Sequence, residues 1–271
     1  MKNDSLYANS RDIRSLDDCF FYHTMDIPGY GVVKGHWDLR DGAAQYLAGL
    51  DLRGKRVLEM GTASGFLCFH MESCGAEVVA YDVNRDGEWD WVPFAGVDLG
   101  KIMAEDRERI DRINNAWWLA HRALRSTARM VHGTVYEVPE AIGPVDVVTY
   151  GCILLHVRDP FLALQMGARM AREQVVVTEP LGRFAIGASM PAPGTFLRRL
   201  LPPRMMFLPD SLTGLPYVTW WRLTPALIRR FLGVLGFEES RVTYHSQLFE
   251  GRRVRLFTVV GRRTCGRATG A

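Results

Sequence analysis

The sequence lacks any apolar run of the length that a membrane-spanning helix needs, which is about 20 residues. It also lacks a signal-like N-terminus, since the chain begins MKNDSLYANSRD. We therefore expect a cytoplasmic protein without membrane contact. No repeat and no low-complexity tract interrupts its 271 residues, and 48% of them are hydrophobic. One domain with a sizeable core and some insertions is the natural expectation.

Cysteine motifs are missing as well. The five cysteines are odd in number and scattered, and none falls in a Cys-x-x-Cys pair. This pattern argues against a disulfide framework and a zinc site, so no metal is expected. Cys68, Cys74 and Cys152 lie in apolar surroundings, which predicts buried thiols.

A strong charge imbalance is also absent, because a net charge of +3 is too small to imply nucleic acid by itself. Arginines nevertheless crowd the C-terminal end of the chain. They are Arg252, Arg253, Arg255, Arg262, Arg263 and Arg267. This cluster is read either as a solvated edge strand and tail or as a surface that contacts an anion or RNA.

The most informative stretch runs from residue 56 to residue 84. An apolar run ending at Met60 is followed by a turn of small residues, a helical pattern, and a second apolar run that ends on Asp82. This order predicts half of a nucleotide-binding βαβ unit. Small residues let a ligand approach the backbone, the helix N-terminus offers free N–H groups, and an acid there can accept hydrogen bonds from ribose hydroxyls.

The turn does not carry the dinucleotide fingerprint Gly-x-Gly-x-x-Gly. It reads Glu59-x-Gly61-x-x-x-Gly65, with Asp82 placed 17 residues after the last glycine. This pattern resembles motif I and its follower in class I S-adenosylmethionine (SAM)-dependent methyltransferases. The resemblance implies SAM as cofactor and S-adenosylhomocysteine (SAH) as product. The turn would line the methionine part of SAM, and Asp82 would bind its ribose.

The resemblance implies a Rossmann-like α/β fold with a seven-stranded sheet, a reversed C-terminal β-hairpin, an N-terminal lid and an insertion after strand five. Its expected parts are an arm and lid (1–50), a SAM-binding core (51–180), a substrate-side insertion (181–222), and a helix with a hairpin (223–271). The expected cofactor-binding residues are Glu59, Gly61, Thr62, Ala63, Gly65, Phe66, Asp82, Val83, Gly133, Thr134, Val135, Tyr150, Gly151 and Trp37.

Local patterns give the other elements. Apolar spacing predicts helices at residues 41–50, 101–126 and 161–172, and a helix that Thr224 caps, Pro225 opens and Gly236 ends. Strands are predicted at residues 128–132, 145–151 and 174–178, followed by a hairpin at 238–246 and 254–260. The proline-rich stretch from residue 182 to 221 cannot form one regular element.

Further motifs resemble a branch of the family related to the enzyme that completes wobble-uridine modification in tRNA with carboxy-SAM. They are residues 22–26 (YHTMD), 37–40 (WDLR) and 151–160 (GCILLHVRDP). In the wider family an acid often follows the third strand and touches the adenine amine. Here Gly133 and Thr134 stand at that place. If adenine is read there, the backbone or the Thr134 hydroxyl must do it.

His156 is the first candidate for a general base or substrate contact, because ligands gather at the ends of strands in open α/β sheets. The alternative is a histidine that orients its loop. His23 and Tyr22 could reach the site from the lid, or could simply pack there. For carboxy-SAM, Lys34 with Arg252 or Arg253 could supply cationic partners, but ordinary SAM is favoured.

Three functions stay open at this point. The first is methyl transfer to a small organic acceptor, for which the near-neutral charge and the apolar, proline-rich insertion suit an enclosed pocket. The second is alkylation of a tRNA wobble uridine. The third is a non-catalytic protein that binds SAM or SAH. The sequence also leaves a homodimer open.

Overall fold

The computed structural model describes residues 6–87, 89–181 and 202–264. Eight strands of these residues form one sheet. They are β3 (Trp37–Asp38), β4 (Arg56–Met60), β5 (Glu77–Asp82), β6 (Arg129–His132), β7 (Val145–Gly151), β8 (Ala171–Pro180), β11 (Glu239–Phe249) and β12 (Arg252–Arg262). The strand order is β3-β11-β12-β8-β7-β4-β5-β6.

The sheet is mixed in a particular way. Strands β4 to β8 run parallel, whereas β12 pairs antiparallel with β8, and β11 pairs antiparallel with β12 and β3. The predicted fold, with its reversed C-terminal hairpin, is therefore confirmed. An eighth strand joins the seven expected ones at the edge, where Trp37 pairs with Phe249.

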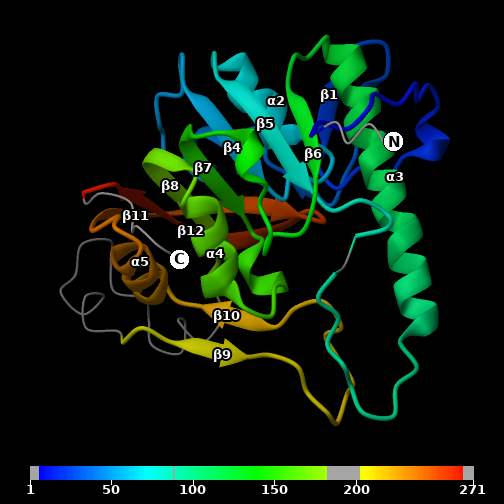
Figure 1. Ribbon diagram of the computed structural model, residues 1–271. Helices are drawn as coiled ribbons and strands as arrows, with labels where there is room; N and C mark the ends of the chain where they lie inside the picture. The colour runs from blue at the N-terminus through cyan, green and yellow to red at the C-terminus, as the bar shows by residue number, and fades with distance from the viewer. Residues whose placement is uncertain (1–5, 88, 182–201, 265–271) are drawn as a thin grey trace.

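Helices cover both faces of the sheet, as Figure 1 shows. Residues of α2, α3 and α1 join one core cluster, and residues of α4 and α5 join the other. The helical bounds are α1 (Ala43–Tyr46), α2 (Phe66–Ser73), α3 (Gly100–Leu124), α4 (Pro160–Ala168) and α5 (Pro225–Val234), with single turns η1 (Leu16–Asp18), η2 (Glu140–Ile142) and η3 (Leu154–His156). None of the helices in the described ranges is long and apolar enough to cross a membrane.

The predicted local signals can be compared with these elements. Residues 145–151 form β7 as predicted, and the Thr224 hydroxyl accepts the hydrogen bond from the Leu227 amide at the start of α5. The predicted helix at 41–50 is wrong in length, because Ala48 and Gly49 take positive φ and stop α1 after one turn. Helix α4 ends before residue 172, because the chain already enters β8 at Ala171.

Two further expectations need comment. Cys74 is exposed at the end of α2 rather than buried, whereas Cys68 is fully buried and Cys152 is half-buried. Nearly half of the predicted insertion (181–222), residues 182–201, lies outside the described residues. Its remainder holds a separate two-stranded sheet of β9 (Met205–Phe207) and β10 (Trp221–Leu223), visible below the main sheet in Figure 1.

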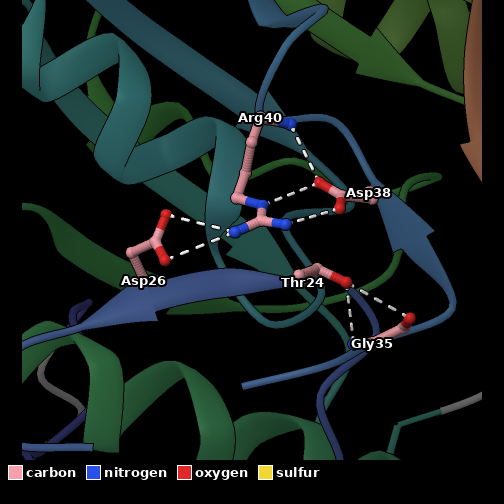
Figure 2. A network of polar contacts seen from close by, with 5 residues as sticks. All are labelled: Thr24, Asp26, Gly35, Asp38 and Arg40. Carbon is pink, nitrogen blue, oxygen red and sulfur yellow. Dashed lines mark hydrogen bonds and ion pairs between the residues drawn. The ribbon is translucent and has the colours of Figure 1, made fainter. Parts of the chain in front are cut away.

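The N-terminal segment packs on the sheet as a small layer of its own. Strands β1 (Met25–Ile27) and β2 (Gly31–Val33) form a hairpin that precedes β3. Figure 2 shows how this layer is tied together: Arg40 contacts the carboxylates of Asp38 and Asp26, and the Thr24 hydroxyl hydrogen-bonds to the Gly35 backbone. The layer is thereby fixed next to the edge strand.

A buried polar network fastens α1 to the C-terminal hairpin. The hydroxyls of Thr178 and Thr258 lie 2.8 Å apart, and both donate to the Tyr46 carbonyl. His245 Nε2 lies 2.9 Å from the Thr258 hydroxyl, and its Nδ1 lies 3.1 Å from the Gln247 amide nitrogen. Because that amide can only donate, Nδ1 must be unprotonated, and the ring is neutral. Burial lowers the pKa of His245 to about 4.

This pKa predicts a stability that depends on pH. Unfolded His245 takes up a proton near pH 6.5, before the folded form does, so its contribution is complete above that pH and is lost as pH falls towards 4. His245→Gln cannot be protonated at this position. Its denaturation midpoint should therefore fall less steeply between pH 6.5 and pH 4 than that of the wild type. Parallel slopes for the two proteins would contradict the network. Titration of other groups cancels in this comparison.

Candidate functional site

The turn after β4 adopts backbone angles that most residues avoid. Gly61, Ala63 and Gly65 have φ values of 77°, 48° and 90°. A Cβ at Gly61 would lie 2.3 Å from the Ile153 side chain, and one at Gly65 would lie 2.5 Å from the Phe69 ring. Glycine at these two places is therefore required by both conformation and space. The turn leads directly into the N-terminus of α2.

Asp82 is held at the end of β5 by backbone groups of the turn. The Ala63 amide donates to Oδ2 at 2.6 Å, and the Val83 amide donates to Oδ1 at 2.8 Å. Burial raises the pKa of Asp82 to about 6, although the two amides work in the opposite direction. The carboxylate is thus ionised at neutral pH, and each oxygen keeps a further lone pair for a ligand.

Glu59 lies beneath the turn and is only 3% exposed. Burial raises the pKa of Glu59 to about 8; the neighbouring Thr62 side chain works in the opposite direction, and the Asp82 charge adds a smaller increase. Its Oε2 has no hydrogen-bond partner among the described residues, and the same holds for the fully buried Thr62 hydroxyl. Glu59 therefore carries a proton at neutral pH in this structure.

A pocket opens where β4, β5, β6 and β7 end. It holds about 510 Å³ of space, part of it open to solvent. Its walls comprise Gly61, Tyr81, Asp82, Val83, Trp89, Asp90, Gly133, Thr134, Val135, Tyr136, Ile153, His156 and Val157. Seven of the predicted site residues are thus brought together, including Asp82 and His156. The carboxyl ends of parallel strands are where open α/β sheets place their ligands.

Other predicted residues lie outside these walls. The Tyr150 hydroxyl donates to the carbonyls of Ala163 and Leu164, so its side chain is buried against α4 and has no access to the pocket. The Trp37 ring packs on Phe249, 4.9 Å between centroids. The remaining four flank the pocket within the turn, at the start of α2 or at the end of β7. They are Ala63, Gly65, Phe66 and Gly151.

His156 occupies the pocket wall formed after β7. Its Nδ1 lies 2.6 Å from the Val218 carbonyl, so Nδ1 carries the proton and Nε2 is the basic nitrogen. Burial lowers the pKa of His156, which keeps the ring neutral at pH 7. No hydrogen bond to Nε2 is found within the described parts of the chain. The arrangement suits a proton acceptor or a substrate contact.

The other two catalytic candidates sit over the turn. The His23 amide donates to the Ser64 hydroxyl at 3.0 Å, and its ring Nδ1 lies 3.3 Å from the same oxygen. Burial lowers the pKa of His23 to about 4 and raises that of Tyr22. The two rings meet edge to face, 5.3 Å apart. These contacts describe packing of the N-terminal layer onto the turn, and neither side chain lines the pocket.

Sequence reasoning missed the wall contributed by residues 89–94, which we call the strap. Trp89 and Asp90 line the pocket, while Trp91 donates from its indole to Asp106 of α3 at 3.0 Å. Figure 1 shows this connection running beside the chain between β9 and β10. There the Val92 amide donates to the Tyr217 carbonyl at 2.7 Å. The aromatic run WDWVPF was the only local signal.

Among the described residues, no group of three or more histidine, cysteine, aspartate or glutamate side chains is placed so that it could hold a metal ion.

No family model matches the sequence, and no curated protein matches it. Solved structures do match. The N-terminal domain of EvdMO1, crystallised in the presence of SAH and D-fucose, is 19% identical over 92% of this chain and 93% of that one, with a TM-score of 0.52. The 1,6-didemethyltoxoflavin-N1-methyltransferase of Burkholderia thailandensis, with bound 1,6-didemethyltoxoflavin and SAH, is 14% identical over 84% of this chain and 78% of that one, with a TM-score of 0.49. The chain thus has the Rossmann-like fold of SAM-dependent methyltransferases.

The turn geometry makes a prediction about stability. Gly65→Ala should lower the free energy of unfolding by about 2 kcal/mol or more, because the new methyl group meets Phe69 and Trp117 at a positive φ. The matched control is Gly233→Ala in α5, where nothing lies within 4 Å of the new Cβ. It should raise stability by about 0.5–1 kcal/mol. Chemical denaturation of both variants measures the contrast, and equal effects would contradict it.

Proposed function

We propose that this protein is a SAM-dependent methyltransferase that transfers a methyl group to a small organic acceptor and releases SAH. The observation that carries the proposal is the carboxylate of Asp82, fixed by the Ala63 and Val83 amides at the rim of a pocket between strand ends. A buried acid in this position pairs with the two hydroxyls of a ribose. The fold is the one in which SAM-dependent methyltransferases occur.

The residues present fit a sulfonium nucleoside. Asp82 would accept from the ribose hydroxyls, the turn from Gly61 to Gly65 would face the methionine part, and Val83 with Ile153 offers apolar walls to the base. The buried, unpaired Oε2 of Glu59 beneath the turn is a polar group that ligand or ordered water can satisfy. When bound, the sulfonium supplies a methyl group that is already activated for displacement.

The chain's own contribution is then positioning, exclusion of water and proton transfer. The strap lines one side of the pocket, and residues 217–220 hold the strap and His156 in place. Nε2 of His156 is the basic atom on that wall and would take the proton of the acceptor. His23 and Tyr22 would act through the packing of the N-terminal layer rather than by direct contact.

A small acceptor, of the kind methylated in secondary metabolism, is favoured by the charge pattern. Many of the arginines described here are paired with acids, including Arg11, Arg56 and Arg122. Lys34, Arg252 and Arg253, the residues considered for carboxy-SAM, are exposed and do not line the pocket, so ordinary SAM is the proposed donor. Alkylation of tRNA rests on the sequence resemblance alone.

Calorimetry with SAH tests the cofactor assignment. Asp82→Ala should weaken SAH binding by about 10- to 100-fold, since a charged acceptor of two hydroxyl groups is lost. For the wild type, affinity should rise as pH increases through about 6 and then level off, because the ionised carboxylate is the better acceptor and the pKa of Asp82 is about 6. Undiminished binding by Asp82→Ala would contradict the assignment, and absence of heat for SAM and SAH would overturn the function.

Variants of His156 test the proton acceptor. His156→Ala should lower transfer of labelled methyl from SAM to an acceptor by about 100-fold or more while changing SAH affinity little. His156→Asn, whose side-chain NH2 stands where Nδ1 stood and can still donate to the Val218 carbonyl, is the matched control for loop position. If His156→Asn restores turnover, His156 only orients its loop. Tight SAH binding with no transfer to any acceptor of a broad panel would favour a non-catalytic role.

A further inference from the structure

A second carboxylate lines the pocket, and the chemistry considered so far leaves it unused. Asp82 closes β5, whereas Asp90 enters from the strap. The two lie in different surroundings. Asp82 is held by the turn, next to β4, whereas Asp90 contacts residues that follow β6 and β7. Together with His156 they are the titratable carboxyl and imidazole groups among the described pocket walls.

The Asp90 side chain is fixed, but only through one of its oxygens. Oδ2 accepts hydrogen bonds from the Tyr136 hydroxyl and from the Arg158 amide, the latter at 2.6 Å. The Tyr136 oxygen in turn accepts from the Asp159 amide at 3.0 Å. For Oδ1, no hydrogen-bond partner is found in residues 6–87, 89–181 and 202–264. The carboxylate therefore keeps one oriented, charged acceptor for a ligand.

The backbone of Asp90 is fixed as well. Its carbonyl accepts from the Trp220 indole at 2.7 Å, and the neighbouring Val92 amide donates to Tyr217. The Arg158 guanidinium lies over the Trp220 ring, 5.1 Å from its centroid. An acceptor held from both its side chain and its main chain loses little entropy when it binds a donor.

The neighbouring loop, residues 133–136, carries no acid that could provide a charged acceptor. The carbonyl of Thr134 already accepts from the Tyr81 hydroxyl at 2.9 Å, and a Cβ at Gly133 would meet that same hydroxyl at 2.1 Å. Space for a longer acidic side chain is therefore missing at Gly133. Beyond the ribose site at Asp82, the pocket end formed by residues 133–136 has Asp90 as its charged acceptor.

We propose that Asp90 is the residue that selects the base: its Oδ1 accepts a hydrogen bond from the exocyclic amine of adenine, so the pocket prefers a 6-amino purine to a 6-oxo purine. The assignment rests on the proposed function, because it takes the pocket ligand to be an adenine nucleoside. A 6-oxo group would set a carbonyl oxygen against the carboxylate and lose the bond. The purine base is thus recognised by Asp90 of the strap rather than by the loop after β6.

The test compares SAH with S-inosylhomocysteine, which carries oxygen in place of the amine and a proton on N1. By calorimetry, the wild type should bind SAH about 10- to 100-fold more tightly. Asp90→Asn should reverse this preference. Its amide oxygen can still accept from Tyr136 and Arg158, while its NH2 group faces the ligand and donates to the 6-oxo oxygen.

Tyr136→Phe is the matched control, because it removes a strap hydrogen bond without touching Oδ1. It should lower the affinity for both nucleosides by the same factor. Equal affinity of the wild type for the two nucleosides would overturn the assignment without any variant. A folded Asp90→Asn protein whose affinity for both nucleosides falls by the same factor would overturn it as well. If the wild type binds SAH without discrimination, the proposed function stands and only the role of Asp90 falls. If it binds neither nucleoside, both fall.

Discussion

The contact between the Ala63 amide and the Asp82 carboxylate is the constraint on which the rest of the site depends. It joins the turn after β4 to the end of β5, and the Gly61 amide adds a bond of 2.8 Å to the Tyr81 carbonyl. To make these bonds, the chain must turn back through positive φ at three of five residues. Glycine occupies two of these three positions for this reason. The buried carboxylate, in turn, is tolerated because backbone amides satisfy it.

Around this contact the molecule assembles walls from segments that are far apart in the sequence. The N-terminal layer rests on the turn through Ser64, and its edge strand β3 pairs with β11 of the C-terminal hairpin. The division into arm, core, insertion and hairpin stays a prediction, but strands of the arm, the core and the hairpin share one sheet. The segments that line the pocket all stand on the ends of the strands. Changes of sequence in these segments therefore leave the sheet intact.

The sheet and its main helices were predictable because their signals are local. Apolar periodicity identified β7 and α3 almost to the residue, and the Thr224–Pro225 pair identified the start of α5. Strand β3 has only two residues, which is too short to show an apolar periodicity. The early end of α1 depends on the positive φ angle of Ala48, and alanine does not indicate such an angle in a sequence. Asp90 was missed for a similar reason. Its partners Tyr136 and Arg158 lie 46 and 68 residues away, and no spacing rule connects them.

The segment of residues 217–220 explains why the two ends of the pocket are not independent. The Tyr217 carbonyl accepts a hydrogen bond from the strap, and the Val218 carbonyl accepts one from Nδ1 of His156. Trp220 donates to the carbonyls of Asp90 and Leu155. A displacement of this segment would therefore move Asp90 and the basic nitrogen of His156 together. Since the same short stretch leads into β10, the insertion is directly connected to the pocket. Under the proposed function, an acceptor that contacts the insertion would therefore act on the same wall that carries His156.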